Sequence, residues 1–479
     1  MKPLELNTDD YRRLAAKITN FTADYLATLE SQPTFPTTSG AETERLFATP
    51  LPEQGMGESS LDALQDVIAH SRRQNGRFFG YVQGPGEPVA ALGDLAASIL
   101  NQNMTAWRSS PAGVTIERTV VRWLAESLSC SNFTGTLTGG GSAANLMGLA
   151  MAREAKAPAN ERGVLDAGRG IIYASEQVHM AVPKAVALLG LGRDNLRSIP
   201  CDSAFRMIPA KLDEAIRQDK AQGKMPIAIV ASAGTVNTGA IDPLVEIAAI
   251  AREHSAWFHI DGAYGALASL AAPDKFKGLS EADSLSLDPH KWLYQPLDCG
   301  CLLHRNIDIA RQTFAYTGDY AKQLSTDPIE GFAFFEETME LSRRCRALKL
   351  WLSIRYHGLS AFRAAIQRDL NHAQNLATDI RNTPDLELLA PVELSAVCFR
   401  HRLRPDASEE DRNKFNTGLM KLIVRRGRIY TSNAILHGKF CLRACIVNCR
   451  TSDADIAEVV PEVLVAAREL CHSLPDPRS

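Results

Sequence analysis

From about Gly135 onward, short apolar runs alternate with amphipathic segments along the chain. The apolar runs predict strands, which lie at residues 133–138, 170–175, 226–232, 257–260, 284–287 and 299–304. Between them, the spacing of apolar residues predicts helices at 143–153, 181–189 and 244–254. Continuous apolar strands separated by helices predict an α/β fold with a largely parallel sheet that is covered on both faces.

The N-terminal region has a different pattern. Residues 9–31 carry apolar side chains three or four positions apart, namely Tyr11, Leu14, Ile18, Phe21, Tyr25 and Leu29. This spacing predicts an amphipathic helix with one apolar stripe. The segment from about residue 31 to 60 is rich in Pro, Thr, Gly and Glu, which predicts an irregular connection. An amphipathic helix that a long linker separates from the rest of the chain favours packing across a subunit interface. Packing within the same chain is the alternative.

The pattern changes again after about Gly358. Helices at 359–382 and 409–425, together with strands at 396–400 and 440–447, predict a smaller α+β domain. The predicted organisation is therefore an N-terminal helical dimerisation segment at 1–77, a large domain at 78–357 and a small C-terminal domain at 358–479.

Composition and charge narrow the class of protein. The chain has 479 residues, 45% of them hydrophobic and 22% charged, as in soluble multidomain proteins. The net charge of -3, with both signs interspersed, gives no indication of a nucleic-acid or membrane partner. The N-terminus lacks the apolar core of a signal peptide and no stretch is long enough to span a membrane, so we expect a cytoplasmic protein.

Ten cysteines without a CxxC pair are typical of reduced thiols in a reducing compartment. Cys441, Cys445 and Cys449 share one face of the predicted strand FCLRACIV and its continuation. We interpret them as core thiols and predict no metal site.

Lys291 stands in the most informative motif, Ser286-Leu-Asp-Pro-His-Lys-Trp292, directly after a predicted strand. Most lysines are solvated surface charges. At a buried strand end, however, desolvation lowers the pKa of the amine, so that it can attack an aldehyde. The adjacent His290 can donate a hydrogen bond to a phosphate, and Asp288 can orient His290.

Two further motifs suit the same chemistry. Asp261 follows the strand WFHI; it can be a helix cap, or the carboxylate that keeps the pyridine nitrogen of pyridoxal phosphate (PLP) protonated. Ala263 lacks bulk and lets a flat ring lie over it. The turn Thr138-Gly-Gly-Gly-Ser-Ala-Ala-Asn145, between a strand and a helix, can present backbone N–H groups to a phosphate, or can simply connect the two elements.

Together these motifs resemble the group II PLP-dependent amino acid decarboxylases, which include the aromatic-L-amino-acid, glutamate, histidine and cysteine-sulfinate decarboxylases. The matching stretches are FFGY (78–81), TGGGSAANL, EQVHMAVPKA, AGTVNTGAID (233–242), FHIDGAYG, DPHKW, SRRCRALKLW (342–351) and LRACIVNCRT (442–451). They occur in the family's order over nearly the whole chain. The resemblance implies the aspartate-aminotransferase fold (fold type I) with a mainly parallel seven-stranded sheet, and a homodimer with shared active sites.

The resemblance also implies roles for individual residues. Lys291 matches the lysine that binds PLP covalently, Asp261 matches the partner of the pyridine nitrogen, and His179 matches the imidazole that stacks on the ring. From its residue type alone, His179 is equally a helix cap. The remaining matches to cofactor-binding positions are Gly141, Ser142, Thr235, Ala263, Asp288 and His290.

Tyr320 bears on the reaction type. It lies in TGDYAKQLSTDPIEGF, a stretch typical of a mobile loop. It matches the tyrosine that protonates the substrate carbon after carbon dioxide leaves, where relatives with Phe form aldehydes. Tyr320 therefore favours simple decarboxylation, and a surface tyrosine without a role is the alternative.

The substrate is less well defined, with Tyr81, Val82, Thr105 and Arg443 at the predicted substrate-binding positions. Aromatic decarboxylases have bulky aromatic residues where this chain has Val82 and Thr105. The stretch 101–104 and Arg443 are similar to glutamate decarboxylases, whereas WRSSPAG is similar to the aromatic branch; Arg443 is alternatively a structural ion-pair residue. The sequence predicts decarboxylation of an L-amino acid, as in aromatic-L-amino-acid decarboxylases. An acidic or diamino acid substrate, another PLP lyase reaction, oxidative decarboxylation and a catalytically silent family member stay open.

Overall fold

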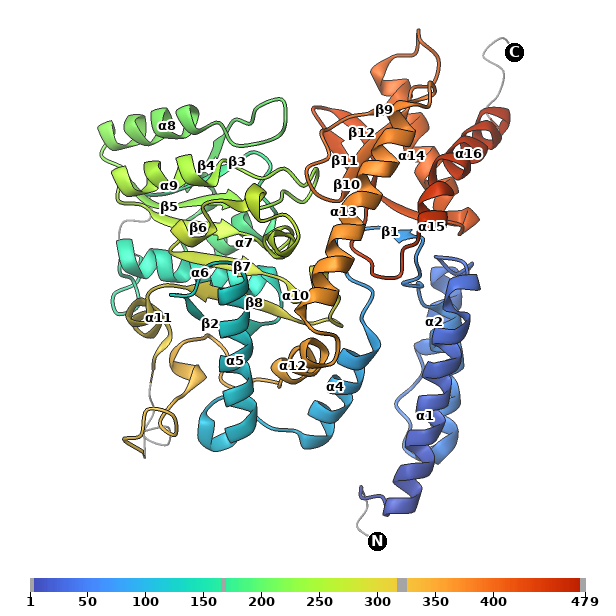
Figure 1. The fold of residues 1–479 in the computed structure, drawn as a ribbon, viewed down its shortest axis with the longest axis horizontal. Helices are drawn as coiled ribbons and strands as arrows, with labels where there is room; N and C mark the ends of the chain where they lie inside the picture. The colour runs from blue at the N-terminus through green and yellow to red at the C-terminus, as the bar shows by residue number, and fades with distance from the viewer. Residues whose placement is uncertain (1–3, 165–168, 317–324, 474–479) are drawn as a thin grey trace.

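The computed structural model describes residues 4–164, 169–316 and 325–473, and its strands form two sheets (Figure 1). The larger sheet has seven strands in the order β2-β8-β7-β6-β5-β3-β4. Their bounds are β2 Thr134–Thr138, β3 Gly170–Ser175, β4 Leu196–Ile199, β5 Met225–Ser232, β6 Trp257–Asp261, β7 Ser284–Leu287 and β8 Gly300–His304. Only β8 runs antiparallel to its neighbours, β2 and β7, so the sheet is mainly parallel as predicted.

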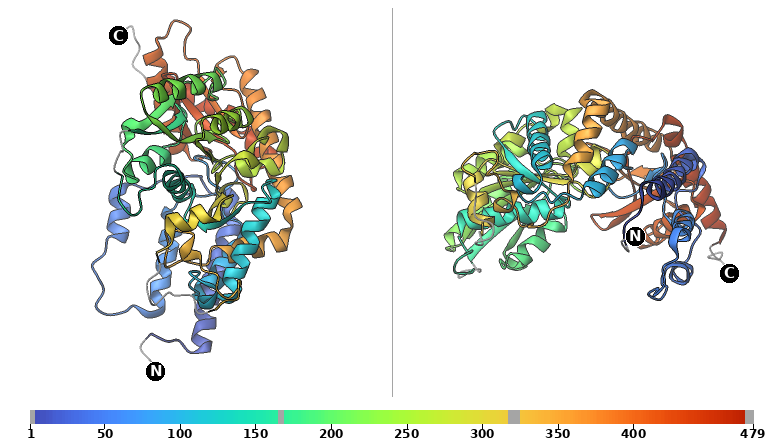
Figure 2. Two further views of the ribbon diagram at one scale, coloured as in Figure 1. Left: turned by 90° about the vertical axis from the view of Figure 1, so that its left-hand side faces the viewer. Right: turned by 90° about the horizontal axis from the view of Figure 1, so that it is seen from below.

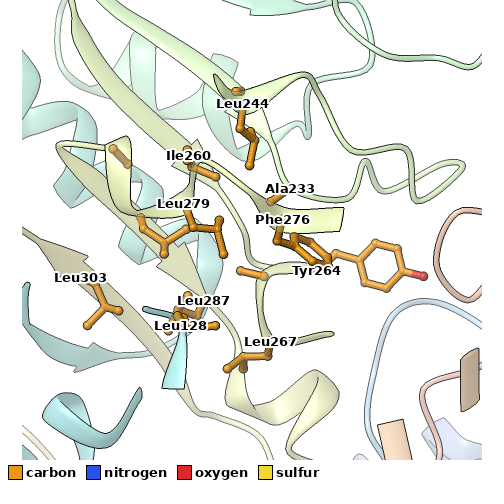
Figure 3. Close-up of a cluster of buried hydrophobic side chains, with 14 of the residues drawn as sticks. Leu128, Ala233, Leu244, Ile260, Tyr264, Leu267, Phe276, Leu279, Leu287 and Leu303 are labelled. Carbon is orange, nitrogen blue, oxygen red and sulfur yellow. The ribbon is translucent and has the colours of Figure 1, made fainter. Parts of the chain in front are cut away.

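Helices cover both faces of this sheet. On one face lie α6 (Gly141–Lys156) and α7 (Ala181–Leu188), and on the other lie α5 (Pro111–Ser127), α8 (Pro209–Ala221) and α9 (Leu244–Glu253). Successive strand residues point to opposite faces, so Ile171 joins one core cluster and Ile172 the other. Figure 3 shows part of the first cluster, which includes Ile260 and Leu287 of the sheet and Leu244 of α9. Apolar contacts on both faces explain why the strands are continuous apolar runs.

The predicted strands of the larger sheet all occur, with bounds that differ from the prediction by at most one residue. Strand β4 was not predicted. Its sequence, Leu-Arg-Ser-Ile, lies at the sheet edge, where Arg197 and Ser198 are exposed. An edge strand buries fewer side chains, so it lacks the apolar run that marked the others.

The smaller sheet has the order β1-β11-β12-β10-β9 and lies beside the C-terminal helices. Its strands are β1 Phe78–Phe79, β9 Leu386–Leu388, β10 Ala396–His401, β11 Tyr430–Leu436 and β12 Lys439–Cys445. The helices that pack with it are α13 (Leu359–Arg381), α14 (Glu409–Arg426), α15 (Asp453–Ala457) and α16 (Val459–Ser473). Strand β1 pairs in parallel with β11, so residues just before the large sheet complete the small one. The exact domain limits stay a prediction.

The N-terminal region forms an arm beside the small sheet (Figures 1 and 2). Helix α1 (Thr8–Thr28) matches the predicted striped helix. The predicted irregular connection after it is wrong in part, because it contains α2 (Gly40–Phe47). The Ser39 side chain accepts a hydrogen bond from the Glu42 N–H, and this Ser-x-x-Glu spacing is the helix-start signal that the compositional argument overlooked. None of the described helices combines the length and apolar character needed to cross a bilayer.

Gly148 allows α6 to approach the sheet closely, which gives a first testable prediction. A Cβ at this position would lie 2.7 Å from Cε1 and 2.8 Å from Nδ1 of His259, a buried ring on β6. We expect Gly148→Ala to lower the free energy of unfolding by about 1–3 kcal/mol, because the ring and its hydrogen bonds to Asn145 and Ser284 must shift. Urea unfolding would measure the loss.

The matched control is Gly40→Ala, which has nothing within 4 Å of its added Cβ and lies in the first turn of α2. This substitution should leave stability unchanged or slightly raised. Equal stability of the Gly148 variant and the wild type would contradict the close approach of α6.

Candidate active site

A cavity of about 280 Å³ lies at the carboxyl ends of the parallel strands, where ligands bind in open α/β sheets. Asp261 ends β6, and Lys291 lies in the short helix α10 (Pro289–Trp292) that follows β7. The first turn of α6 follows β2 and contributes backbone to the same cavity. The predicted site residues that line it are Val82, Gly141, Ser142, His179, Asp261, Ala263, Asp288, His290 and Lys291.

Lys291 lies within an ion pair at the wall of this cavity. Its Nζ is 3.0 Å from Oδ2 of Asp288, and its side chain is 18% exposed. The Nδ1 of His290 is 2.8 Å from the carbonyl oxygen of Cys299, and its Nε2 is 3.5 Å from the same Asp288 oxygen. Burial lowers the pKa of His290. In the described part of the chain, Oδ1 of Asp288 is buried without a hydrogen-bond partner.

Asp261 is buried and hydrogen-bonded from two sides. Its Oδ1 accepts hydrogen bonds from the Ala263 N–H and the Ser286 hydroxyl, both at 3.2 Å. His179 accepts a hydrogen bond from the Ala181 N–H on Nδ1, at 3.2 Å, so its neutral ring carries the proton on Nε2. Burial lowers the pKa of His179, with Asp261 opposing this shift and Lys291 adding to it.

The first turn of α6 forms a backbone cradle. Gly140 has φ +126°, a conformation that favours glycine. A Cβ on Gly141 would lie 2.7 Å from the Cβ of Ala263 and 3.0 Å from Oδ2 of Asp288. The space beside this helix terminus is therefore open only because residue 141 lacks a side chain. The N-terminus of a helix attracts phosphate through its free N–H groups and its dipole.

These groups fit pyridoxal phosphate. The cavity combines an amine, a hydrogen-bonded carboxylate, a neutral imidazole, the small side chain of Ala263 and a helix N-terminus. The model of the pyridoxal-dependent decarboxylase conserved domain matches residues 47–402 of the chain. The chain belongs to this family.

Comparisons over the full length agree. An aromatic-L-amino-acid decarboxylase of Bacillus atrophaeus is 33% identical over 98% of both chains. Tryptophan decarboxylase 1 of Oryza sativa subsp. japonica is 31% identical over 92% of this chain and 90% of its own. A crystal structure of Oryza sativa TDC with PLP and tryptamine superposes with a TM-score of 0.91, at 28% identity, over 98% of this chain and 99% of the other. The protein is a PLP-dependent amino acid decarboxylase of fold type I.

Several predicted site residues of the decarboxylase do not line the cavity of the single chain. The Nε of Arg443 donates to the carbonyl oxygen of Asn237 at 3.1 Å, and its Nη1 donates to the Ser432 hydroxyl at 3.1 Å. The Tyr81 hydroxyl is 3.2 Å from that of Tyr430. In this structure Arg443 joins the two sheets, and Tyr81 is half exposed at their junction.

The other residues outside the cavity lie in the large domain. The Thr235 hydroxyl is 3.0 Å from that of Thr238 within the turn after β5. Thr105 is paired with the segment at Phe335 through its backbone carbonyl. Tyr320 lies outside the described residues. The roles of these residues in binding or catalysis stay predictions.

The cavity of the decarboxylase also contains residues that are not among the individually predicted site residues. They are Gly139, Gly140, Asn145, Gly234, Val236, Tyr264 and Leu297. Asn145 and Tyr264 lie inside motifs already quoted for the family, so the motif spacing could have indicated them. Leu297 lies in an irregular segment between α10 and β8, where residue type gives no signal.

One group of potential metal ligands occurs among the described residues, away from this cavity. It consists of Asp213, Glu253 and His254. Arg217 donates to both carboxylates at 2.8 Å, so the group is an ion-pair cluster in this structure.

Proposed function

We propose that this decarboxylase acts on aromatic L-amino acids. The observation that carries the proposal is the 33% identity with an aromatic-L-amino-acid decarboxylase over 98% of both chains. The cavity supports it, because Val82, Val236 and Leu297 give apolar surface next to Lys291. An acidic substrate would need a cation for its side chain. Among the described lining residues the only Lys or Arg is Lys291, which faces Asp288.

The positions of Lys291, Asp261 and His179 in the cavity support the roles proposed for them. When bound, PLP supplies the electron-withdrawing ring that allows the bond between Cα and the carboxylate to break. Lys291 holds the cofactor through Nζ, and the first turn of α6 binds its phosphate. Asp261 keeps the pyridine nitrogen protonated, because a buried carboxylate favours a neighbouring positive charge. His179 would pack on the cofactor ring, and Tyr320, which is assigned through the family resemblance alone, would return a proton to Cα.

A panel of L-amino acids tests the substrate class. The PLP-loaded protein would be incubated with aromatic, acidic and diamino acids, and both carbon dioxide and the organic product would be measured. We expect amines from tyrosine, tryptophan, phenylalanine or their ring-hydroxylated derivatives. Amine formation only from glutamate, aspartate or 2,4-diaminobutyrate would contradict the proposal, as would aldehyde with ammonia in place of amine.

We further infer that the active protein is a cytoplasmic homodimer. Helix α1 has no buried residue, and Tyr11 and Ile18 on its stripe are more than 40% exposed. Helix α4 (Pro88–Leu100) likewise exposes Leu92, Leu95 and Ile99 at helical spacing. Two uncovered apolar helix faces favour a second copy as their cover. The ten cysteines, all free thiols in the structure, are compatible with a reducing compartment.

Sedimentation velocity tests the dimer. We expect the wild type to sediment as two chains, and Ile18→Asp to shift the population toward one chain, because a buried charge on the stripe would be unpaired. Asn20→Asp, at an exposed position on the opposite face of the same helix, is the matched control. A wild type that stays monomeric at micromolar concentration would refute the inference.

The neutral state of His179 gives a pH prediction. Burial lowers the pKa of His179, so the ring stays neutral as the pH falls through about 6.5, the value of a free histidine. If the neutral ring is the active form, kcat should hold through pH 6.5 and decline only below it. Stopped-time assays between pH 5 and 8 would locate the decline.

The variant His179→Phe keeps a flat ring but has no titrating group. We expect it to be slower than the wild type, and to lack the part of the acid decline that belongs to His179. An identical acid limb in both proteins would assign the decline to another group.

A further inference from the structure

The segment Val82–Glu87 packs directly against the turn that carries Lys291. The Gly84 N–H donates to the carbonyl oxygen of His290 at 3.0 Å, and the Glu87 N–H donates to that of Tyr294 at 2.8 Å. A Cβ on Gly84 would lie 2.7 Å from the Lys291 carbonyl oxygen. The backbone of this segment is therefore in direct contact with the backbone of the Lys291 turn. Val82, at the start of the segment, lines the cavity. A shift of this segment would move both Val82 and the Lys291 turn.

Arg450 holds this segment from the other sheet. It follows β12, and its guanidinium donates to the carbonyl oxygens of Pro85 at 3.1 Å and Gly86 at 3.0 Å. A third hydrogen bond, of 3.4 Å, reaches the carbonyl oxygen of Gln74. The planar fork of an arginine can satisfy several carbonyls at fixed angles, which a lysine cannot do. Arg450 thus fixes the Val82–Glu87 segment by its backbone.

A second set of hydrogen bonds connects residues 448–450 with Tyr294, which follows Lys291 in the same turn. The N–H of Asn448 donates to Oδ2 of Asp369 at 2.9 Å, and the Tyr294 hydroxyl donates to the same oxygen at 2.9 Å. The Arg450 N–H in turn donates to Oδ1 of Asn448 at 3.0 Å. Burial raises the pKa of Asp369 to about 7. Residues 448–450 therefore hold the Lys291 turn through Tyr294 and through the Val82–Glu87 segment.

We propose that Arg450 is a positioning residue for decarboxylation, which acts through the Val82–Glu87 segment to hold Lys291 and Val82 at the cavity. The inference rests on the role proposed above for Lys291. It extends the site to a residue of the small sheet that does not line the cavity. Misplacement of a reacting group by about 1 Å costs on the order of 10²-fold in rate, so loss of this support should appear in kcat.

The test uses the full-length, PLP-loaded protein and the amino acid that the wild type decarboxylates fastest. We expect Arg450→Ala to reduce kcat by about tenfold to a hundredfold at a temperature well below its unfolding transition. Guanidinium chloride at low millimolar concentration should restore kcat several-fold, because a free guanidinium ion can fill the vacated site. Arg450→Met fills the space with an apolar chain and should not respond to guanidinium.

Arg412→Ala is the matched control, because the Arg412 guanidinium also donates to three backbone carbonyl oxygens, which belong to Arg402, Arg404 and Pro405. It removes a guanidinium from the small domain without touching residues 448–450 or the Val82–Glu87 segment, and its kcat should stay within about twofold. A second variant, Gly84→Ala, pushes the segment away from the Lys291 turn with Arg450 intact. It should lower kcat as Arg450→Ala does, but guanidinium should not restore it.

Two outcomes would overturn the proposal. One is an Arg450→Ala protein that melts earlier but keeps the wild-type kcat. The other is a loss of kcat that guanidinium does not restore, together with a fully active Gly84→Ala. If Arg450→Ala does not fold, the Gly84→Ala result decides. Borohydride reduction followed by peptide mapping distinguishes failure of the Arg450 proposal from failure of the proposed function. If the reduced cofactor is absent from Lys291 in the wild type, the role of Lys291 itself is refuted.

Discussion

Replacing Lys291 with alanine is expected to reduce the rate of carbon dioxide release by about 10⁴-fold or more, in line with the loss of a covalent catalytic group. Lys291 is the only amine among the described residues that line the cavity. Its Nζ lies 3.0 Å from Asp288, and no neighbouring lysine shares the wall of the cavity in the described ranges. Single-turnover assays with saturating cofactor would measure the loss, and borohydride reduction would measure whether the cofactor is retained.

Lys291→Arg separates the covalent role of the amine from its charge. Arginine can keep an ion pair with Asp288, but it does not act as an amine nucleophile at neutral pH. We therefore expect Lys291→Arg to be as inactive as Lys291→Ala while melting closer to the wild type. Retention of more than a few per cent of the wild-type rate by the arginine variant would mean that the charge, and not the covalent bond, is what the reaction needs.

Replacing Arg343 with methionine is expected to lower the free energy of unfolding by about 3–5 kcal/mol, the usual result of breaking a buried ion pair. The side chains of Arg343 and Glu117 are both 0% exposed, and Nη2 lies 2.5 Å from Oε1 of Glu117. The guanidinium also donates to the Thr136 hydroxyl at 2.6 Å and to the carbonyl oxygen of Met104 at 2.9 Å. Removal of the arginine leaves a buried carboxylate without its counter-charge. The midpoint of urea unfolding would measure the change.

The double variant Arg343→Met with Glu117→Gln provides the control. A glutamine at 117 keeps an oxygen that can accept the Leu137 N–H, now bonded at 3.0 Å, but brings no charge into the core. We expect the double variant to be more stable than Arg343→Met alone. A single variant that loses less than about 1 kcal/mol would show that Glu117 reaches solvent or a new partner.

Much of the large sheet and its cavity could be predicted because both depend on local sequence signals. Strands with two apolar faces produce continuous apolar runs. Asp261 ends one of these strands, and Gly141 and Lys291 follow shortly after two others. The carboxyl ends of parallel strands meet at one edge of a sheet, so motifs far apart in sequence converge there. Asp261, Gly141 and Lys291 do line one cavity.

Features that depend on tertiary contacts could not be predicted in the same way. Glu117 lies in α5 and Arg343 in an irregular segment, and nothing in their neighbours marks them as a buried pair. Arg443 was matched to a substrate-binding position, but its contacts with Asn237 and Ser432 follow from how the two sheets pack. Leu297 lines the cavity from an irregular segment. Each of these positions depends on a partner more than 100 residues away or on loop geometry.

The pairing of β1 with β11 also bears on how the chain is made. Phe78 pairs with Tyr430 and Phe79 with Thr431, so an early strand finds its partner some 350 residues later. During translation, Phe79, which is 0% exposed in the finished protein, has no partner strand until the C-terminal region has left the ribosome. The two-residue strand therefore joins its sheet late, and chains that terminate before residue 430 would keep this aromatic side chain exposed to chaperones and proteases.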